Sequence, residues 1–363
     1  MKTYHLFQFG KGNIGGALIK QVVHRVDAMQ TQYGFHFEYV GVCGQSQAVY
    51  DQAGLNEALE KQTDINQMLT NDPGCIAYPG PMAMLDIVLR NNSPNLFVID
   101  ATGAEMTDVH LTCLRQGIPV ITANKKPIAD DYSAYDEIQR LGRGSTFRYW
   151  YETTAGAGLP VISAIKELVD TGDTVLEIAG CLSGTLGYIC SQLDTGCAFS
   201  DIVVEAQALG FTEPDPREDL NGMDVARKAL ILAREIGYIL NMSDLQVDGM
   251  VSDTLLEAPS VDAFMARLSQ EDEVYARRMA AAREQGQVLR YMATVKNGAC
   301  QVGLQSVPLD SPTGSLTGPD NIVVCTTARY KDNPLVIRGP GAGPEVTAGG
   351  LFGDLIKAAR VID

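Results

Sequence analysis

The sequence predicts an α/β chain, with an N-terminal doubly wound parallel sheet followed by an α+β domain that has its own sheet. Two observations carry this prediction. Over the first half of the 363 residues, short apolar runs alternate with amphipathic stretches, which is the pattern of βαβ units. Beyond residue 151 the alternation ends, and the last third carries apolar runs separated by turn residues, which are typical of antiparallel strands.

The expected elements follow this pattern in chain order. Continuous apolar runs predict strands of a covered sheet, and apolar spacing near 3.6 residues predicts helices. We expect strands at 4–9, 35–42, 97–99, 118–122, 174–180, 289–295, 300–307 and 321–327. We expect helices at 14–26, 107–116, 161–169, 186–193, 202–209, 223–236 and 346–359. The pattern places a first domain at 1–151, a second at 152–335 and a C-terminal segment at 336–363.

Composition excludes several functions. The net charge is −16, from 28 basic and 44 acidic side chains, so we expect no nucleic-acid or membrane partner. The four histidines lack metal-ligand spacing and the eight cysteines form no C-x-x-C pair, so neither a zinc site nor a redox dithiol is indicated. Scattered cysteines, no signal peptide and no apolar run of membrane-spanning length predict a cytoplasmic protein.

The turn after the first predicted strand has the spacing G-x-G-x-x-G. The first glycine permits a tight turn, the second lets a pyrophosphate approach the backbone, and the third allows close helix–strand packing. Because the motif follows a strand and opens a helix, it predicts a Rossmann-type dinucleotide site rather than a plain strand–helix turn. Its residues are Gly10, Lys11, Gly12, Asn13, Ile14 and Gly15.

The choice between NAD and NADP stays open at this point. An acidic residue at the end of the second strand would bind the adenosine ribose of NAD. Residues 41–46 carry no acid, and they also lack a clear arginine for a 2′-phosphate. The missing acid favours NADP slightly.

Polar residues also follow the next two predicted strands of the first domain. Thr102 and Gly103 come after one strand, and Asn124 and Lys125 come after the other. Ligands bind at the carboxyl edge of open α/β sheets, so this edge is a candidate for the rest of the cofactor site. A solvated surface lysine fits Lys125 at least as well as a lysine that faces the nicotinamide or the substrate.

An acidic loop precedes the strongest predicted helix. Pro214 and Pro216 stiffen this loop, because proline cannot continue a helix, and Glu213 lies within it. Asp224 and Lys228 follow on the helix, four residues apart on one face. Spacing alone favours an exposed ion pair. Reduction of a carbonyl would give the lysine a chemical role, since hydride attack leaves negative charge on oxygen that a positioned acid neutralises.

Several motifs, in this order, resemble those of homoserine dehydrogenase over nearly the whole chain. Besides the glycine turn and the acidic loop they are N-K-K-P at 124–127, Y-E-T-T-A-G-A-G-L-P at 151–160, G-T-L-G-Y-I at 184–189 and G-P-G-A-G at 339–343. The resemblance implies NAD(P)-dependent interconversion of L-aspartate 4-semialdehyde and L-homoserine, in the biosynthesis of threonine, methionine and isoleucine.

The resemblance also implies the roles of individual residues. By matching position, Lys228 resembles the proton donor to the aldehyde oxygen, and Lys125 the second lysine near nicotinamide and substrate. Glu213 is similar to the carboxylate that binds the substrate amino group. The other residues assigned in this way are Asp219, Asp224, Thr185 and Gly187 around the substrate, and Gly341 and Gly343, which return to the cofactor with the C-terminal segment.

Glu152, with the carbonyl groups of Ala155, Ala157 and Leu159, is similar to the monovalent-cation site of the family, usually occupied by sodium. One carboxylate and a carbonyl-lined turn supply the oxygen ligands that a hard cation prefers. A carboxylate at a helix N-terminus is the alternative for Glu152. The resemblance further implies a homodimer. Because the chain stops at Asp363, directly after the last predicted helix, we expect neither an aspartate kinase domain nor a C-terminal regulatory domain.

Two other functions are possible for a chain with a dinucleotide site, a semialdehyde dehydrogenase and a non-catalytic dinucleotide sensor. A semialdehyde dehydrogenase of the same architecture needs a cysteine nucleophile with a histidine partner, and all four histidines lie in the first third of the chain. A non-catalytic dinucleotide sensor would carry a partner-binding module such as a basic helix-turn-helix, which this acidic sequence does not indicate.

Overall fold

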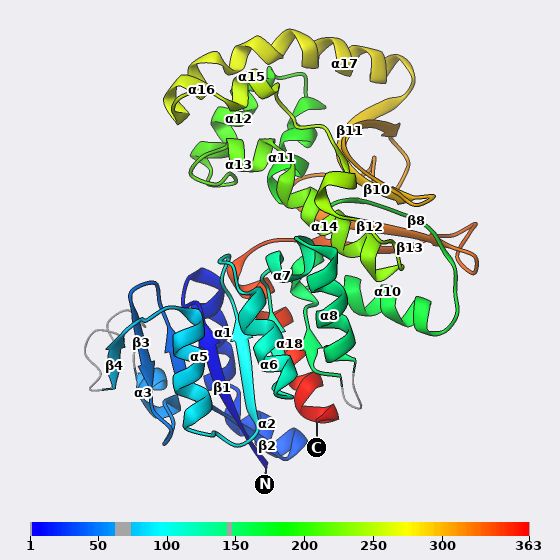
Figure 1. The fold of residues 1–363 in the computed structure, drawn as a ribbon. Helices are drawn as coiled ribbons and strands as arrows, with labels where there is room; N and C mark the ends of the chain where they lie inside the picture. Colours follow the sequence, from blue (N-terminus) through cyan, green and yellow to red (C-terminus); the bar gives the residue numbers. More distant parts are fainter. Residues whose placement is uncertain (1, 62–73, 144–146, 363) are drawn as a thin grey trace. The chain divides into compact units, whose positions relative to one another are not determined.

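The computed structural model describes residues 2–61, 74–143 and 147–362 (Figure 1). The chain divides into two compact units, one formed by Met1–Gly158 with Gly343–Asp363, and the other by Leu159–Ala342. The first unit therefore extends beyond the predicted boundary at 151/152, because the short helix α9 (Thr153–Gly156) packs on the last helix of that unit. None of the described helices is long and apolar enough to cross a membrane.

A seven-stranded sheet forms the centre of the first unit, in the order β4-β3-β2-β1-β5-β6-β7. The five strands from β2 to β7 in this order are parallel, as predicted, whereas β3 and β4 add an antiparallel edge that the sequence pattern did not predict. From β1 the sheet grows to β2 on one side and to β5 on the other, so the topological switch point lies beside β1. The strands are β1 (Lys2–Phe9), β2 (Phe35–Cys43), β3 (Gln47–Tyr50), β4 (Cys75–Ala77), β5 (Leu96–Asp100), β6 (Val120–Thr122) and β7 (Tyr149–Trp150).

Two helices from opposite ends of the chain pack together in this unit, α1 (Asn13–Val23) and α18 (Pro344–Val361). The Tyr4 hydroxyl of β1 donates to the carbonyl oxygens of Ala359 and Ile362, at 2.7 and 2.8 Å. Apolar side chains of α1, α18 and the central strands form one buried core, which explains why the C-terminal helix belongs to the first unit.

The predicted helix at 14–26 is wrong in its extent, because two helices occupy this region. Helix α1 ends at Val23, where the Lys20 carbonyl oxygen accepts the backbone N–H of His24 at 3.1 Å and also lies 2.7 Å from the Nδ1 atom of His24, and α2 (Val26–Tyr33) then begins anew. The other helices that the structure describes in this unit include α3 (Asn56–Lys61), α5 (Pro81–Arg90), α6 (Thr107–Arg115), α7 (Lys126–Ala129) and α8 (Tyr132–Gly142).

The second unit has its own six-stranded sheet, as predicted, in the order β13-β12-β8-β10-β11-β9. All neighbouring strands are antiparallel except β9 and β11. Because β13 pairs with β12, it stays in this unit, and the segment that returns to the first unit begins at Gly343 rather than at residue 336. The strands are β8 (Val175–Cys181), β9 (Gln246–Val247), β10 (Gln287–Lys296), β11 (Ala299–Pro308), β12 (Asp320–Thr327) and β13 (Leu335–Pro340).

Helix α14 (Met223–Glu235) begins at a position that only glycine can occupy. Gly222 has φ +74°, and a Cβ atom there would lie 1.9 Å from the Tyr291 hydroxyl oxygen. This contact with β10 fixes where the helix starts, and with it the placement of Asp224 and Lys228 in its first two turns. The other helices of the unit are α10 (Val161–Asp170), α11 (Gly184–Leu193), α12 (Phe199–Ala208), α13 (Arg217–Leu220), α15 (Asp253–Leu256), α16 (Val261–Arg267) and α17 (Asp272–Glu284), with 3₁₀ turns at Met242–Asp244 and Leu268–Glu271.

Candidate active site

The glycine turn joins β1 to α1, as its spacing predicts. Gly10 has φ +90°, and a Cβ atom there would lie 2.8 Å from the Ala101 carbonyl oxygen. A Cβ atom on Gly15 would lie 2.1 Å from the Gly10 carbonyl oxygen, so both positions require glycine. No atom lies within 4 Å of a Cβ built on Gly12, the residue just before α1. The turn is therefore rigid at its two ends and leaves space at its centre, next to the free N–H groups of the helix.

A buried glutamine that the sequence pattern did not single out holds this turn. The side-chain amide of Gln8 donates to the carbonyl oxygens of Gly10 and Gly15, at 2.8 and 3.0 Å. The Tyr39 hydroxyl of β2 donates in turn to the Gln8 amide oxygen at 3.0 Å. Because every partner is buried or partly buried, this network fixes the backbone that a dinucleotide would approach.

A cavity of about 1010 Å³ opens at the carboxyl edge of the first sheet. Its walls come from the glycine turn, the residues after β2 and the loop after β5. Of the predicted cofactor residues the lining contains Gly10, Gly12, Thr102 and Gly103, and it does not contain Asn13, Ile14, Gly15, Lys125, Gly341 or Gly343. Among the described lining residues Lys11 carries the one charged side chain, so the lining itself bears a positive charge in a strongly acidic protein.

One buried carboxylate organises the loops that follow β5 and β6. Asp100 accepts hydrogen bonds from the backbone N–H and the hydroxyl of Thr102, at 2.9 and 2.7 Å. Its other oxygen accepts from the Asn124 side-chain amide at 2.9 Å and lies 3.0 Å from Nε2 of His110. The Nδ1 atom of His110 lies 2.9 Å from the Tyr149 hydroxyl. An acid at the end of an apolar strand is the sequence signal that could have predicted this network.

Lys228 lies in α14 with its ammonium group held by two acceptors. Its Nζ atom lies 2.8 Å from Oδ2 of Asp224 and donates to the Leu182 carbonyl oxygen at 2.7 Å. The side chain of Lys228 is 12% exposed and that of Asp224 46%, so the pair differs from the exposed ion pair that spacing alone favours. An ammonium group has three N–H donors, so one remains for a further acceptor.

Asp219 of α13 links the acidic loop to α11. It accepts a hydrogen bond from the Thr185 hydroxyl at 3.0 Å and from the backbone N–H of Glu213 at 2.8 Å. Burial raises the pKa of Asp219, and the nearby carboxylates of Glu213 and Asp224 act in the same direction. The structure thus brings four of the predicted substrate residues together: Asp219, Thr185, Glu213 and Asp224. Gly187, the fifth, lies on α11 beside the Gly318 carbonyl.

The second acid of the loop, Asp215, has a different environment. Its carboxylate hydrogen-bonds to the Arg217 guanidinium at 2.6 Å, and this bond lowers the pKa of Asp215. Arg217 also donates to the Ala258 carbonyl oxygen at 2.6 Å. Asp215 therefore holds the loop in place, whereas the exposed side chain of Glu213 remains available to a ligand.

Glu152 lies at the start of α9 with its side chain 7% exposed. Its backbone N–H donates to the buried carboxylate of Asp354 at 2.9 Å, and Nζ of Lys357 lies 3.6 Å from the Glu152 carboxylate. In the described part of the chain, no three His, Cys, Asp or Glu side chains form a group that could hold a metal ion. A cation beside Glu152 would thus take most of its ligands from carbonyl oxygens, the predicted ones being those of Ala155, Ala157 and Leu159.

Two protein-family models match the chain in sequence. The model for the NAD-binding domain of homoserine dehydrogenase matches residues 10–152, and the model for homoserine dehydrogenase itself matches residues 160–356. The chain belongs to the homoserine dehydrogenase family. The first match covers the cavity at the glycine turn, and the second covers the cluster around Lys228 and Asp219.

Curated relatives of this homoserine dehydrogenase family member are bifunctional. The chain is 40% identical to the chloroplastic bifunctional aspartokinase/homoserine dehydrogenase 2 of Zea mays over 97% of its length, and spans 38% of that protein. It is 36% identical to bifunctional aspartokinase/homoserine dehydrogenase 2 of Escherichia coli over 99% of its length, and spans 44% of that protein. The chain thus spans less than half the length of these relatives.

Solved structures share the fold over the whole chain. A Candida auris protein of unknown function is 31% identical, with a TM-score of 0.88 and 99% of each chain covered. A hyperthermophilic archaeal homoserine dehydrogenase in complex with NADPH is 24% identical, with a TM-score of 0.75 and 99% of each chain covered. The predicted fold class, a Rossmann-type domain joined to an α+β domain with its own sheet, is confirmed.

Proposed function

We propose that the chain catalyses the NAD(P)-dependent interconversion of L-aspartate 4-semialdehyde and L-homoserine, in the biosynthesis of threonine, methionine and isoleucine. The environment of Lys228 carries the proposal, together with the family match. Its ammonium is largely buried, is oriented by two acceptors and has one N–H donor left. The cluster of Glu213, Asp219 and Thr185 in the same unit suits a small substrate that carries an ammonium group.

In this proposal the residues of the chain bind the substrate and supply a proton. When bound, the nicotinamide cofactor supplies the hydride that reduces the aldehyde. Nζ of Lys228 donates a proton to the carbonyl oxygen as negative charge develops there, and Asp224 holds this lysine in its orientation. Glu213 and Asp219 bind the substrate ammonium. Lys125, which follows β6 in the first unit, is the second lysine that we assign to nicotinamide and substrate.

The direct test is turnover of L-homoserine by the purified chain, followed through the absorbance of the reduced nicotinamide with NADP or NAD. We expect Glu213→Gln to raise KM for homoserine at least about tenfold with little change in kcat, because it removes a contact made throughout the reaction. Glu218→Gln, an exposed acid on the adjoining α13, is the matched control. Absence of turnover with either cofactor, in protein whose circular dichroism shows it to be folded, would contradict the proposal.

We further propose that NADP is preferred over NAD. The residues lining the cavity after β2 are Cys43, Gly44, Gln45, Ser46 and Gln47, with no acid to repel a 2′-phosphate. Lys11 adds a positive charge to the same lining, and NADPH is the nucleotide in the archaeal relative's complex. Lys11→Gln is expected to lower kcat/KM for NADP more than for NAD, and Gln45→Asp to reverse the preference. Equal effects on both cofactors would contradict the assignment.

A monovalent cation, most simply sodium, is proposed beside Glu152. The donor set supports it, since one buried carboxylate stands next to a turn in which Ala157 has φ +51°. Such a cation would brace α9, and it takes no part in the proton transfer. Tm is expected to rise in sodium chloride relative to tetramethylammonium chloride at equal ionic strength. Glu152→Gln should abolish this difference and Glu167→Gln, an exposed acid on α10, should keep it. A difference that survives in Glu152→Gln would contradict the site.

We also propose a homodimer, formed through one face of the second sheet. Val336, Val324, Ala179 and Thr294 are successive register partners across four strands, so they share a face. Each is exposed or half-buried, which suits a surface that a second copy covers. Val336→Glu is expected to give a monomer in light scattering, whereas Val361→Glu, at a valine of the first unit that is also exposed, should leave the dimer intact.

The cellular compartment is proposed to be the cytoplasm. All eight cysteines are free, and Cys197 is exposed, which suits a reducing environment. Fractionation of cells that produce the chain, with detection by antibody, tests this directly.

A further inference from the structure

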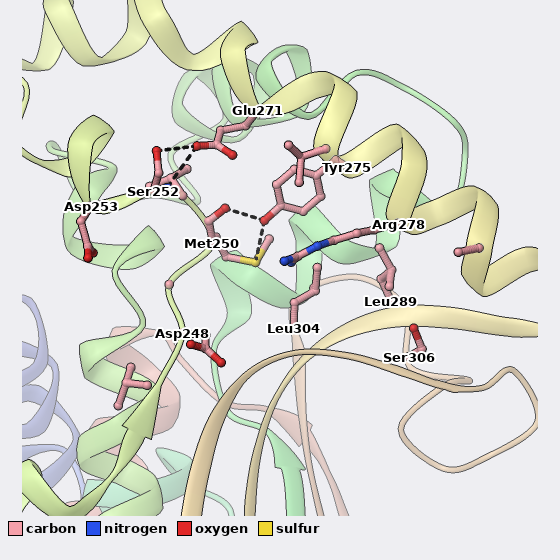
Figure 2. Close-up of a pocket in the computed structure, with 15 residues that line it drawn as sticks. Asp248, Met250, Ser252, Asp253, Glu271, Tyr275, Arg278, Leu289, Leu304 and Ser306 are labelled. Atoms are coloured by element: carbon pink, nitrogen blue, oxygen red, sulfur yellow. Dashed lines mark hydrogen bonds between the residues drawn. The ribbon is translucent and has the colours of Figure 1, made fainter.

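A second cavity, of about 690 Å³, lies in the second unit between α17 and the strands β10 and β11 (Figure 2). None of its lining residues belongs to the cluster around Lys228, Asp219 and Glu213. The proposed reaction therefore leaves this cavity without a use.

One cation reaches into this cavity. Arg278 extends from α17, and Figure 2 shows its guanidinium next to the side chain of Met250. Arg278 forms no hydrogen bond or ion pair with any described residue, whereas the preceding Arg277 pairs with Glu273 within its own helix. Arg278 is exposed, so its guanidinium lies at the rim of the cavity, where without a protein partner it is suited to bind a carboxylate in bidentate fashion.

Three carboxylates also line the cavity, those of Asp248, Asp253 and Glu271. Oε1 of Glu271 accepts hydrogen bonds from the backbone N–H and the hydroxyl of Ser252, at 3.1 and 2.8 Å. Its second oxygen accepts none from the residues that the structure describes. Glu271, Ser252 and Asp253 lie on the opposite side of Met250 from Arg278 (Figure 2).

An ordered apolar surface separates the two charged ends. Met250 is 2% exposed and Leu289 4%, and Leu304 lines the cavity beside them. The Tyr275 hydroxyl donates to the Met250 carbonyl oxygen at 2.5 Å, which fixes this segment against α17. Along its length the cavity thus has a positively charged end, then an apolar floor, then a negatively charged end.

We propose that this cavity binds a free amino acid whose side chain ends in a second ammonium group. Arg278 binds the carboxylate, the partly exposed Leu304 contacts the methylene groups, and Glu271 with Asp253 receives the side-chain ammonium. Asp248 is the acceptor for the α-ammonium. Because carboxylates outnumber the guanidinium in the lining, a ligand of net positive charge is favoured over a neutral amino acid.

The test measures the binding of three probes by calorimetry and by the shift in Tm. L-lysine carries all the required groups, L-norleucine lacks the side-chain ammonium, and cadaverine lacks the carboxylate. L-lysine is expected to bind at least about tenfold more tightly than either analogue, since each lacks one charge-assisted contact. Equal binding of norleucine or cadaverine, or no binding of lysine, would overturn the proposal.

Two variants of α17 show whether the binding depends on the cavity. Arg278→Gln is expected to weaken lysine binding at least about tenfold, and Arg277→Gln, its neighbour outside the cavity, to leave it unchanged. Because the proposed substrate is itself an amino acid, lysine binding is also measured in Glu213→Gln. Binding that is lost there, or that is equal in the two arginine variants, would assign lysine to another site and overturn the inference.

Discussion

The Nζ atom of Lys228 lies 2.8 Å from Oδ2 of Asp224, and it also donates to the Leu182 carbonyl oxygen at 2.7 Å. An exposed i,i+4 ion pair on a helix surface contributes only about 0.3–0.5 kcal/mol to helix stability. Here the lysine side chain is 12% exposed and its ammonium is held from two directions. This arrangement is suited to a lysine that must present one N–H in a fixed direction, and it leads to the first prediction.

Lys228→Ala is expected to lower kcat by a factor on the order of 10²–10⁴, the usual contribution of a general acid. Asp224→Asn should lower kcat less, because the Leu182 carbonyl still holds the ammonium. Steady-state kinetics with homoserine measures both, and Arg227→Ala, on the same helix, is the control. A near-normal kcat for Lys228→Ala, in protein with an unchanged Tm, would show that the lysine has a structural role only.

The two glycines at the start of α1 are expected to respond differently to alanine. Gly15→Ala places a Cβ atom 2.1 Å from the Gly10 carbonyl oxygen, so we expect a large fall in Tm or failure to fold. Gly12→Ala meets no atom within 4 Å, so it should fold with nearly the wild-type Tm. Its methyl group occupies the space through which a pyrophosphate approaches the backbone, and Kd for NADPH should rise at least about tenfold. Unchanged NADPH binding would place the cofactor elsewhere.

The fold could be predicted from the sequence where local pattern and burial agree. The five residues of β5 are all buried, so the strand is visible in the sequence as a continuous apolar run. Helix α14 carries a continuous apolar stripe, so it is visible as apolar residues at helical spacing. Helix α17 was missed because its buried residues are Tyr275 and Ala282 alone, which gives no stripe. Strands β3 and β4 have four and three residues, and their pairing depends on neighbours that are distant in sequence.

The candidate site was predicted where residues lie close together in sequence. The spacing of Asp224 and Lys228 implies a shared helix face, and the structure agrees. The networks around Asp100 and Gln8 are not predicted, because they join side chains from separate elements, His110 of α6 to Asp100 and Tyr39 of β2 to Gln8. The burial of Lys228 could not be predicted from the sequence either, since its ammonium is held by the Leu182 carbonyl, 46 residues earlier in the chain.

At Asp219 the requirements of stability and of substrate binding are expected to conflict. Burial raises its pKa, so the folded chain holds this proton more tightly than the unfolded chain. Its contribution to the free energy of unfolding is therefore complete at low pH and is lost as pH rises through the folded-state pKa. Asp219→Asn removes this titration, so thermal melts across a pH series should show an equal or higher Tm than wild type at alkaline pH.

The same substitution is expected to raise KM for homoserine, because an amide binds an ammonium group less strongly than a carboxylate does. Thr185→Val is the companion variant, since it removes the hydroxyl that donates to Asp219 without changing the number of charges. A Tm that falls at alkaline pH in Asp219→Asn would show that the ionised carboxylate stabilises the fold, contrary to the direction of its pKa.

Thiol chemistry separates the proposed reaction from that of a semialdehyde dehydrogenase with a cysteine nucleophile. Burial raises the pKa of Cys181, Cys190 and Cys300 to about 12 and that of Cys325 to about 11, so their thiolate forms are scarce at neutral pH. Burial raises the pKa of Cys43 and Cys113 as well. Iodoacetamide should therefore alkylate the exposed Cys197 and the partly buried Cys75 of the folded chain, and spare the six buried thiols.

Mass spectrometry of the alkylated chain, paired with an activity assay, measures this outcome. Homoserine turnover should be retained, because the proposed proton donor is a lysine and neither reactive cysteine lies in the cluster around it. Alkylation in guanidinium chloride, where all eight thiols are accessible, is the control for reagent efficiency. Loss of activity that substrate prevents, traced to one buried cysteine, would mean that this thiol is a thiolate in the folded chain, and would favour nucleophilic catalysis over proton donation by Lys228.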